Sequence, residues 1–155
     1  MSLIHFKIEP SQEEEHKVLN IYIDNENIIE LIKKYEMQFE PQIAGGYEGP
    51  SINFLKNINE HLFGELNEND LFNYDGKTQI LGCNCGEPEC WPLLVKIKVN
   101  DEIVVWSEFK QPHRNEDSGE YWDYSNLKPL EFNRKQYEEQ VSDISKKLKE
   151  VDNSI

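Results

Sequence analysis

The chain has 155 residues, of which 30 are acidic and 16 are basic, so its formal net charge at pH 7 is −14. Its length predicts one domain spanning residues 1–155, and its charge argues against nucleic-acid binding, because the chain would repel a phosphate backbone. No apolar run approaches the ~20 residues of a membrane span, and no basic region followed by an apolar block opens the chain. We therefore expect a cytoplasmic protein without a membrane partner. The acidity suits a basic protein partner, although net charge favours solubility first.

The N-terminal part of the chain predicts two paired strands. Ile4, Phe6 and Ile8 alternate with polar residues, which is the period of a half-buried strand. A second strand over residues 18–23 is expected to pair with the first in antiparallel fashion. These two segments would form the first hairpin of a sheet.

A helix is predicted next, capped by Asp24 or Asn25. Its apolar set comprises Ile28, Ile29, Leu31, Ile32 and Tyr35. Residues 44–50 contain three glycines and a proline and predict a loop. A short helix is expected beyond it, through Ile52, Leu55 and Ile58.

The second half predicts three strands, over residues 78–83, 93–99 and 103–109. We expect a three-residue loop over residues 100–102, because a two-residue loop would mix apolar and polar faces. This register places Val99 opposite Ile103, Ile97 opposite Val105, and Leu93 opposite Phe109. It also sets Lys96 opposite Trp106, where a cation–π contact would form.

The last predicted element is a helix. Asn133 and Gln136 resemble a capping box. One apolar stripe follows at spacings of three and four, comprising Tyr137, Val141, Ile144, Leu148 and Val151. The predicted fold class is therefore α+β, a mostly antiparallel sheet with two to three helices packed on it.

All three cysteines lie within residues 82–91. Extending the predicted register of the last two strands brings His113 opposite Glu89, next to Cys90. Cys83 and Cys85 end the preceding strand, and pairing of that strand with the next one would fold them back towards Cys90. The topology therefore predicts that three thiols and one imidazole converge.

Three interpretations of this cluster stay open. Three cysteines and one histidine form a common tetrahedral set for structural zinc, although the Cys-x-Cys-x4-Cys spacing is unusual. The thiols could equally be unligated, since an odd number of cysteines predicts no disulfide framework. A nucleophilic cysteine with His113 as its base is the third interpretation, and Asp117 or Asp123 would then orient the imidazole.

Aromatic residues surround the cysteines in sequence, namely Trp91, Trp106, Tyr121, Trp122 and Tyr124. They predict either part of the core or a pocket with Glu108, Arg114 and Glu120 at its rim. Trp122 and Tyr124 fall in a predicted loop and are the better candidates for exposure. The candidate rim for a ligand or partner therefore comprises Glu108, Arg114, Trp122 and Tyr124.

Four stretches carry a resemblance to a known family. They are AGGYEGP at residues 44–50, ILGCNCGEPECWPL at 80–93, VVWSEFKQPHR at 104–114 and WDYSNLKPLEFNRKQYEE at 122–139. The chain resembles a family of small uncharacterised bacterial proteins with Cys-x-Cys-Gly…Cys-Trp-Pro-Leu and Gln-Pro-His-Arg segments. The resemblance implies a bacterial protein in which the cysteines, His113 and Arg114 belong to one unit, and it implies no activity.

The sequence contains none of the common nucleotide-binding, hydrolase or metalloprotease motifs. Our first hypothesis is a non-enzymatic binding or accessory module whose Cys3His unit is either purely structural or binds a metal, with zinc as the candidate ion. The second is an immunity-type protein that neutralises a basic toxin, and the third is a thiol-dependent enzyme.

Overall fold

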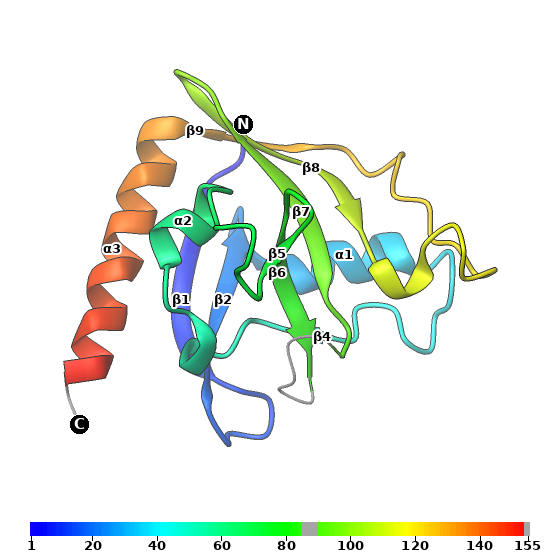
Figure 1. The fold of residues 1–155 in the computed structure, drawn as a ribbon, viewed down its shortest axis with the longest axis horizontal. Coiled ribbons are helices and arrows are strands. Elements are labelled where there is room, and N and C mark those ends of the chain that lie inside the picture. Colours follow the sequence, from blue (N-terminus) through cyan, green and yellow to red (C-terminus); the bar gives the residue numbers. More distant parts are fainter. Residues whose placement is uncertain (85–89, 154–155) are drawn as a thin grey trace.

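The computed structural model describes residues 1–84 and 90–153. Within these ranges the strands form a three-stranded and a six-stranded sheet, and their paired strands are antiparallel (Figure 1). The helices are α1 (Ile28–Glu36), α2 (Ile58–Leu62) and α3 (Arg134–Asn153), with 3-10 turns at Ile52–Phe54 and Pro112–Arg114. One cluster of buried apolar side chains joins both sheets, α1 and α3. The predicted α+β class is confirmed.

The three-stranded sheet consists of β1 (Ile4–Pro10), β2 (Lys17–Ile23) and β3 (Glu26–Asn27). The predicted antiparallel pairing of the first two strands is confirmed. The predicted helix cap is wrong. Asp24 and Asn25 have φ values of 51° and 69° and make the tight turn from β2 to β3, a left-handed geometry that Asp and Asn tolerate. Asn27 caps α1 instead, because its Oδ1 accepts a 2.9 Å hydrogen bond from the amide of Ile29.

The six-stranded sheet has the order β4–β6–β7–β8–β9, with β5 beside β6. Its strands are β4 (Tyr47–Glu48), β5 (Asn73–Tyr74), β6 (Lys77–Cys83), β7 (Leu93–Val99), β8 (Ile103–Lys110) and β9 (Leu130–Asn133). The pairing of β6 with β7 agrees with the sequence prediction. The short strands β4 and β9 were not predicted, since too few residues lie in each to show a period.

The predicted register of β7 and β8 is wrong by one residue. The amide of Asn100 donates a 2.8 Å hydrogen bond to the carbonyl of Ile103, so the loop has two residues. Ile97 therefore lies opposite Trp106, and Val99 lies opposite Val104. A one-residue slip exchanges the faces of a strand, and this register buries Trp106, which is fully shielded from solvent.

A β-bulge at Glu108 then changes which residues of β8 face the core: Val104 and Trp106 are buried before it, and Phe109 is buried after it. Two steps along β7, from Lys96 to Leu94, face three steps along β8, from Ser107 to Lys110. Glu108 adopts φ 53° and stays exposed, while Phe109 returns to the core. The predicted contact of Lys96 with Trp106 is wrong as well, because Lys96 forms a 3.7 Å ion pair with Glu108.

The C-terminal helix α3 begins where the sequence predicts, with Asn133 as its cap. Oδ1 of Asn133 accepts a 3.0 Å hydrogen bond from the amide of Gln136. The Gln136 side chain bonds to the backbone of Ile4 (2.8 Å to its carbonyl) and so fastens β1 to α3. The buried stripe of Tyr137, Val141 and Ile144 packs α3 beside β1 and α2 (Figure 1).

The predicted helix through Ile52, Leu55 and Ile58 is wrong. Leu55 has an extended backbone (φ −88°, ψ 91°) and separates the 3-10 turn from α2. The segment is therefore two short turns rather than one helix.

Candidate functional site

Four stretches far apart in the sequence, residues 44–50, 80–93, 104–114 and 122–139, meet at one end of the six-stranded sheet. Tyr47 comes from the first stretch, Trp91 from the second, Gln111 to Arg114 from the third, and Trp122 to Tyr124 from the fourth. They gather against α1, on the side of the molecule opposite α3 (Figure 1). Hydrogen bonds and ring contacts between residues far apart in sequence hold this cluster together.

A buried carboxylate lies at the centre of the cluster. Glu36, in the last turn of α1, has no exposed surface. Its Oε2 accepts hydrogen bonds from the hydroxyls of Tyr47 (2.6 Å) and Tyr124 (2.5 Å), and its Oε1 accepts one from the amide of Gly45 (2.9 Å). Gln111 adds a 3.2 Å bond to the Tyr47 hydroxyl. One carboxylate thus joins α1, β4, the end of β8 and the loop that follows it.

The electrostatics of Glu36 follow from its burial. Burial raises the pKa of the carboxyl, and the three hydrogen bonds that it accepts oppose this shift. Burial and the nearby carboxylate also raise the pKa of Tyr47 and of Tyr124, so both hydroxyls stay protonated and donate. The two hydroxyls and the Gly45 amide therefore offset part of the cost of burying the Glu36 carboxylate.

A second polar group, centred on Arg114, lies beside the first. Nε of Arg114 lies 2.8 Å from Oε2 of Glu40, and Nε1 of Trp122 donates to the same oxygen at 2.9 Å. The guanidinium lies over the rings of Trp91 (5.0 Å) and Trp122 (5.7 Å). The hydrogen bond from Arg114 lowers the pKa of Glu40 and raises the pKa of Arg114 itself. Arg114 therefore links Glu40 to the rings of Trp91 and Trp122, and its role at a ligand or partner rim stays a prediction.

Two predicted exposed residues are buried. Trp122 is 3% exposed and Tyr124 is 6% exposed. Trp122 stacks on Phe39 (5.4 Å between ring centroids), and Tyr124 stacks on Tyr35 (5.5 Å). The loop prediction for these residues is correct, but side chains from the end of α1 and from the turn after it cover them.

Cys83, Cys90 and His113 lie at the same end of the sheet. Cys83 ends β6 opposite Tyr47, and Cys90 is exposed. The His113 ring stacks on Trp91, next to Cys90, with 5.9 Å between centroids. Cys85 lies outside the described residues. Among residues 1–84 and 90–153, no three His, Cys, Asp or Glu side chains gather as a metal ion requires, so the predicted zinc set stays a prediction.

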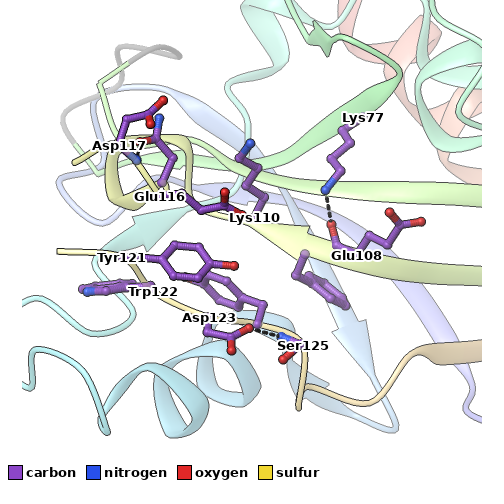
Figure 2. Close-up of a pocket in the computed structure, with 12 residues that line it drawn as sticks. Lys77, Glu108, Lys110, Glu116, Asp117, Tyr121, Trp122, Asp123 and Ser125 are labelled. Atoms are coloured by element: carbon purple, nitrogen blue, oxygen red, sulfur yellow. Dashed lines mark hydrogen bonds between the residues drawn. The ribbon is translucent and has the colours of Figure 1, made fainter. Parts of the chain in front are cut away.

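A pocket of about 360 Å³ opens between β8 and the segment 115–125 (Figure 2). Buried Phe109, Trp122 and Tyr124 contribute to its lining, and Tyr121 beside them is 48% exposed. The remaining lining residues are polar or charged, comprising Lys77, Glu108, Lys110, Asn115, Glu116, Asp117, Asp123 and Ser125. Three of the four predicted rim residues, all except Arg114, therefore line one cavity.

Within the pocket, the bulge of β8 fixes Lys77. The Lys77 ammonium donates a 2.9 Å hydrogen bond to the backbone carbonyl of Glu108. Burial lowers the pKa of Lys77, and the charge of Glu108 opposes this shift. Lys110, at the end of β8, is exposed and faces the same opening.

The contribution of α1 to this site was not predicted from the sequence. Ile28 and Ile32 are fully buried, and Glu36 continues their spacing of four. A charged residue on the buried stripe of a helix is the signal that could have identified the carboxylate. Tyr121 belongs to the aromatic set that the sequence singled out, whereas no comparable signal marks Lys110, which comes to the pocket at the end of β8 after the bulge.

Comparisons with known proteins add no relative, since no protein-family model, curated protein or solved structure matches this chain. No helix in the described ranges is both long and apolar enough to span a bilayer. The cytoplasmic location and the basic protein partner stay predictions.

Proposed function

We propose that this protein is a binding module and that its recognition site is the pocket between β8 and the segment 115–125. The proposal rests on one observation: Trp122 and Tyr124 are held rigidly within the fold and also line the pocket. Glu36 and Glu40 hold these two residues by hydrogen bonds, the rings of Tyr35 and Phe39 stack on them, and both residues also line the pocket. A preformed concave surface with aromatic and convergent polar groups is the usual form of a small-molecule site.

The hydrogen bonds of the cluster favour binding over catalysis. Both carboxylate oxygens of Glu36 accept bonds from within the fold, and Glu40 is shared by Arg114 and Trp122. A general acid or base needs to reach a substrate atom at about 2.6–3.2 Å, and these carboxylates face protein donors instead. They act as scaffolding behind the pocket.

A fragment screen by two-dimensional NMR tests the proposal. We expect bound fragments to shift the amide signals of Lys110, Tyr121 and Asp123. In Tyr121→Ala these shifts should weaken, whereas Tyr74→Ala, which alters a partly exposed tyrosine outside the pocket, should leave them unchanged. Fragments that shift only signals away from these residues would overturn the proposal.

We also propose that Cys83, Cys85, Cys90 and His113 hold a structural zinc ion. The stacking of His113 on Trp91, beside Cys90, supports this set. Mass spectrometry of untagged native protein should find one zinc per chain, lost with chelator and in His113→Gln but kept in His16→Gln. A folded protein that never takes up stoichiometric zinc would remove this proposal.

A further inference from the structure

We propose that the pocket binds a small zwitterion, a free α-amino acid or a short peptide with both termini free, that carries an aromatic or large apolar side chain. This inference rests on the proposed binding function. The class of ligand follows from the charged side chains and the Tyr121 ring that line the cavity.

The two sides of the pocket carry opposite charge. Lys77 and Lys110 come from β6 and β8, while Asp117 and Asp123 come from the facing segment, which also supplies Glu116 (Figure 2). The Glu108 carboxylate is paired with Lys96, which lies outside the lining. One side can therefore attract a carboxylate while the other attracts an ammonium group.

This arrangement disfavours ligands of a single charge. A simple anion would meet three carboxylates, on a protein whose net charge is already −14. A simple cation would meet the ammonium groups of Lys77 and Lys110. A zwitterion places each of its charges beside the opposite charge of the pocket, and charge-assisted hydrogen bonds are stronger than neutral ones.

The lining groups have capacity for such bonds. An ammonium group has three donors, and Lys77 uses one on the carbonyl of Glu108. A carboxylate has about four acceptor sites, and the Asp123 side chain holds the amide of Ser125 at 2.8 Å. That hydrogen bond also fixes the direction of the Asp123 carboxylate before a ligand arrives.

The exposed ring of Tyr121 indicates that the ligand has an aromatic or large apolar side chain. This ring is 48% exposed, although Phe109, Trp122 and Tyr124 next to it are at most 6% exposed. Covering an exposed ring with apolar surface is favourable, and aromatic pairs gain further from stacking. The cavity volume of about 360 Å³ lies at the lower end of small-molecule sites, which span roughly 300–1,000 Å³.

The test compares ligands that share the phenylalanine side chain but differ in whether they carry the ammonium and carboxylate charges. The probes are L-phenylalanine, N-acetyl-L-phenylalanine, which lacks the ammonium charge, and L-phenylalanine amide, which lacks the carboxylate. Affinities come from NMR shifts of the Lys110, Tyr121 and Asp123 signals. We expect L-phenylalanine to bind at least about tenfold more tightly than either capped form. Two dipeptides, Phe-Gly and Gly-Phe, separate a free amino acid from a short peptide as the natural source.

Two variants connect each charge to its side of the pocket. Lys110→Met should weaken L-phenylalanine and leave the amide unchanged. Asp123→Asn, which keeps the acceptor for Ser125, should weaken L-phenylalanine and leave the N-acetyl form unchanged. Lys98→Met is the matched control, because Lys98 is exposed on the same sheet but lies outside the pocket lining.

The outcomes separate this inference from the proposed function. If the capped probes bind in the pocket as tightly as L-phenylalanine, the zwitterion is wrong and the binding module stands. If no probe shifts a pocket signal, the zwitterion is overturned as well, and the fragment screen then decides the binding module by itself.

Discussion

Glu36 and Tyr124 lie 88 positions apart in the chain and share a hydrogen bond of 2.5 Å between the tyrosine hydroxyl and the buried carboxylate. Through this bond, α1 holds the segment that lines the pocket. The stability of the fold and the shape of the recognition site therefore depend on the same contact.

Removing one hydroxyl tests this dependence. In Tyr124→Phe, the carboxylate of Glu36 loses one of its three donors, and an underbonded buried charge costs about 1–3 kcal/mol. We expect the free energy of unfolding in urea to fall by that amount. Tyr121→Phe is the control, because its ring is half exposed, and an equal loss in both variants would contradict the role of the buried bond.

The pH dependence of stability has a defined sign at Glu36. Burial raises the pKa of this carboxyl above its ordinary value of 4.5, so the folded chain holds the proton more tightly than the unfolded chain does. The free energy of unfolding contributed by this group is therefore highest at low pH and falls as the pH rises from about 4.5 through the raised pKa. Glu36→Gln abolishes this titration.

Urea unfolding of both proteins between about pH 4 and pH 8 checks the prediction. We expect the stability of the wild type relative to Glu36→Gln to decline with rising pH. The comparison cancels the other acidic groups, which are the same in both proteins. Parallel pH curves would show that Glu36 titrates alike in the folded and unfolded chains.

The bulge at Glu108 predicts that glycine is more stabilising than alanine at this position, the reverse of the usual order in a strand. Its φ of 53° is left-handed, where a side chain with a Cβ costs roughly 1–2 kcal/mol relative to glycine. Glycine also loses more backbone entropy on folding, about 0.5–1 kcal/mol. We therefore expect Glu108→Gly to be more stable than Glu108→Ala by about 0.5–1 kcal/mol in thermal or urea unfolding.

Lys98, on the regular part of the neighbouring strand, supplies the control. There the alanine variant should be more stable than the glycine variant, which is the ordinary order in a strand. The same order at both positions would be evidence against the bulge.

Gly49 predicts a steric effect at the contact between the two sheets. A Cβ at this position would lie 2.0 Å from the carbonyl oxygen of Leu19 in β2, and backbone cannot move aside cheaply. We expect Gly49→Ala to lower the free energy of unfolding by about 1–3 kcal/mol. Gly46→Ala, whose Cβ would lie 3.1 Å from the nearest atom, should have a smaller effect. Equal unfolding temperatures for Gly49→Ala and the wild type would contradict the close approach.

Local patterns predicted the elements that have a clear period. The alternation in β1 and the stripe in α3 identified both elements, because each buries one face against the core. The register of β7 and β8 was wrong because both strands carry apolar residues on both faces, and only the burial of Trp106 distinguishes the two registers. A bulge such as the one at Glu108 interrupts the two-residue alternation of a strand, so the sequence pattern does not reveal it.

The candidate site was predicted in part. The sequence identified Trp122 and Tyr124 as neighbours of a pocket but predicted that they are exposed. The residues that cover them, Tyr35 at the end of α1 and Phe39 in the turn after it, lie far away in the chain. Such contacts depend on tertiary packing rather than on local pattern. The cysteine set remains a prediction from spacing and topology.

The bond between Gln136 and Ile4 joins positions 132 residues apart, and the amide of Ser2 also bonds to the carbonyl of Glu131. During synthesis, the first strand therefore leaves the ribosome long before the residues that secure it. Until α3 has been made, its outer edge lacks these bonds, and an open strand edge is where other chains can pair.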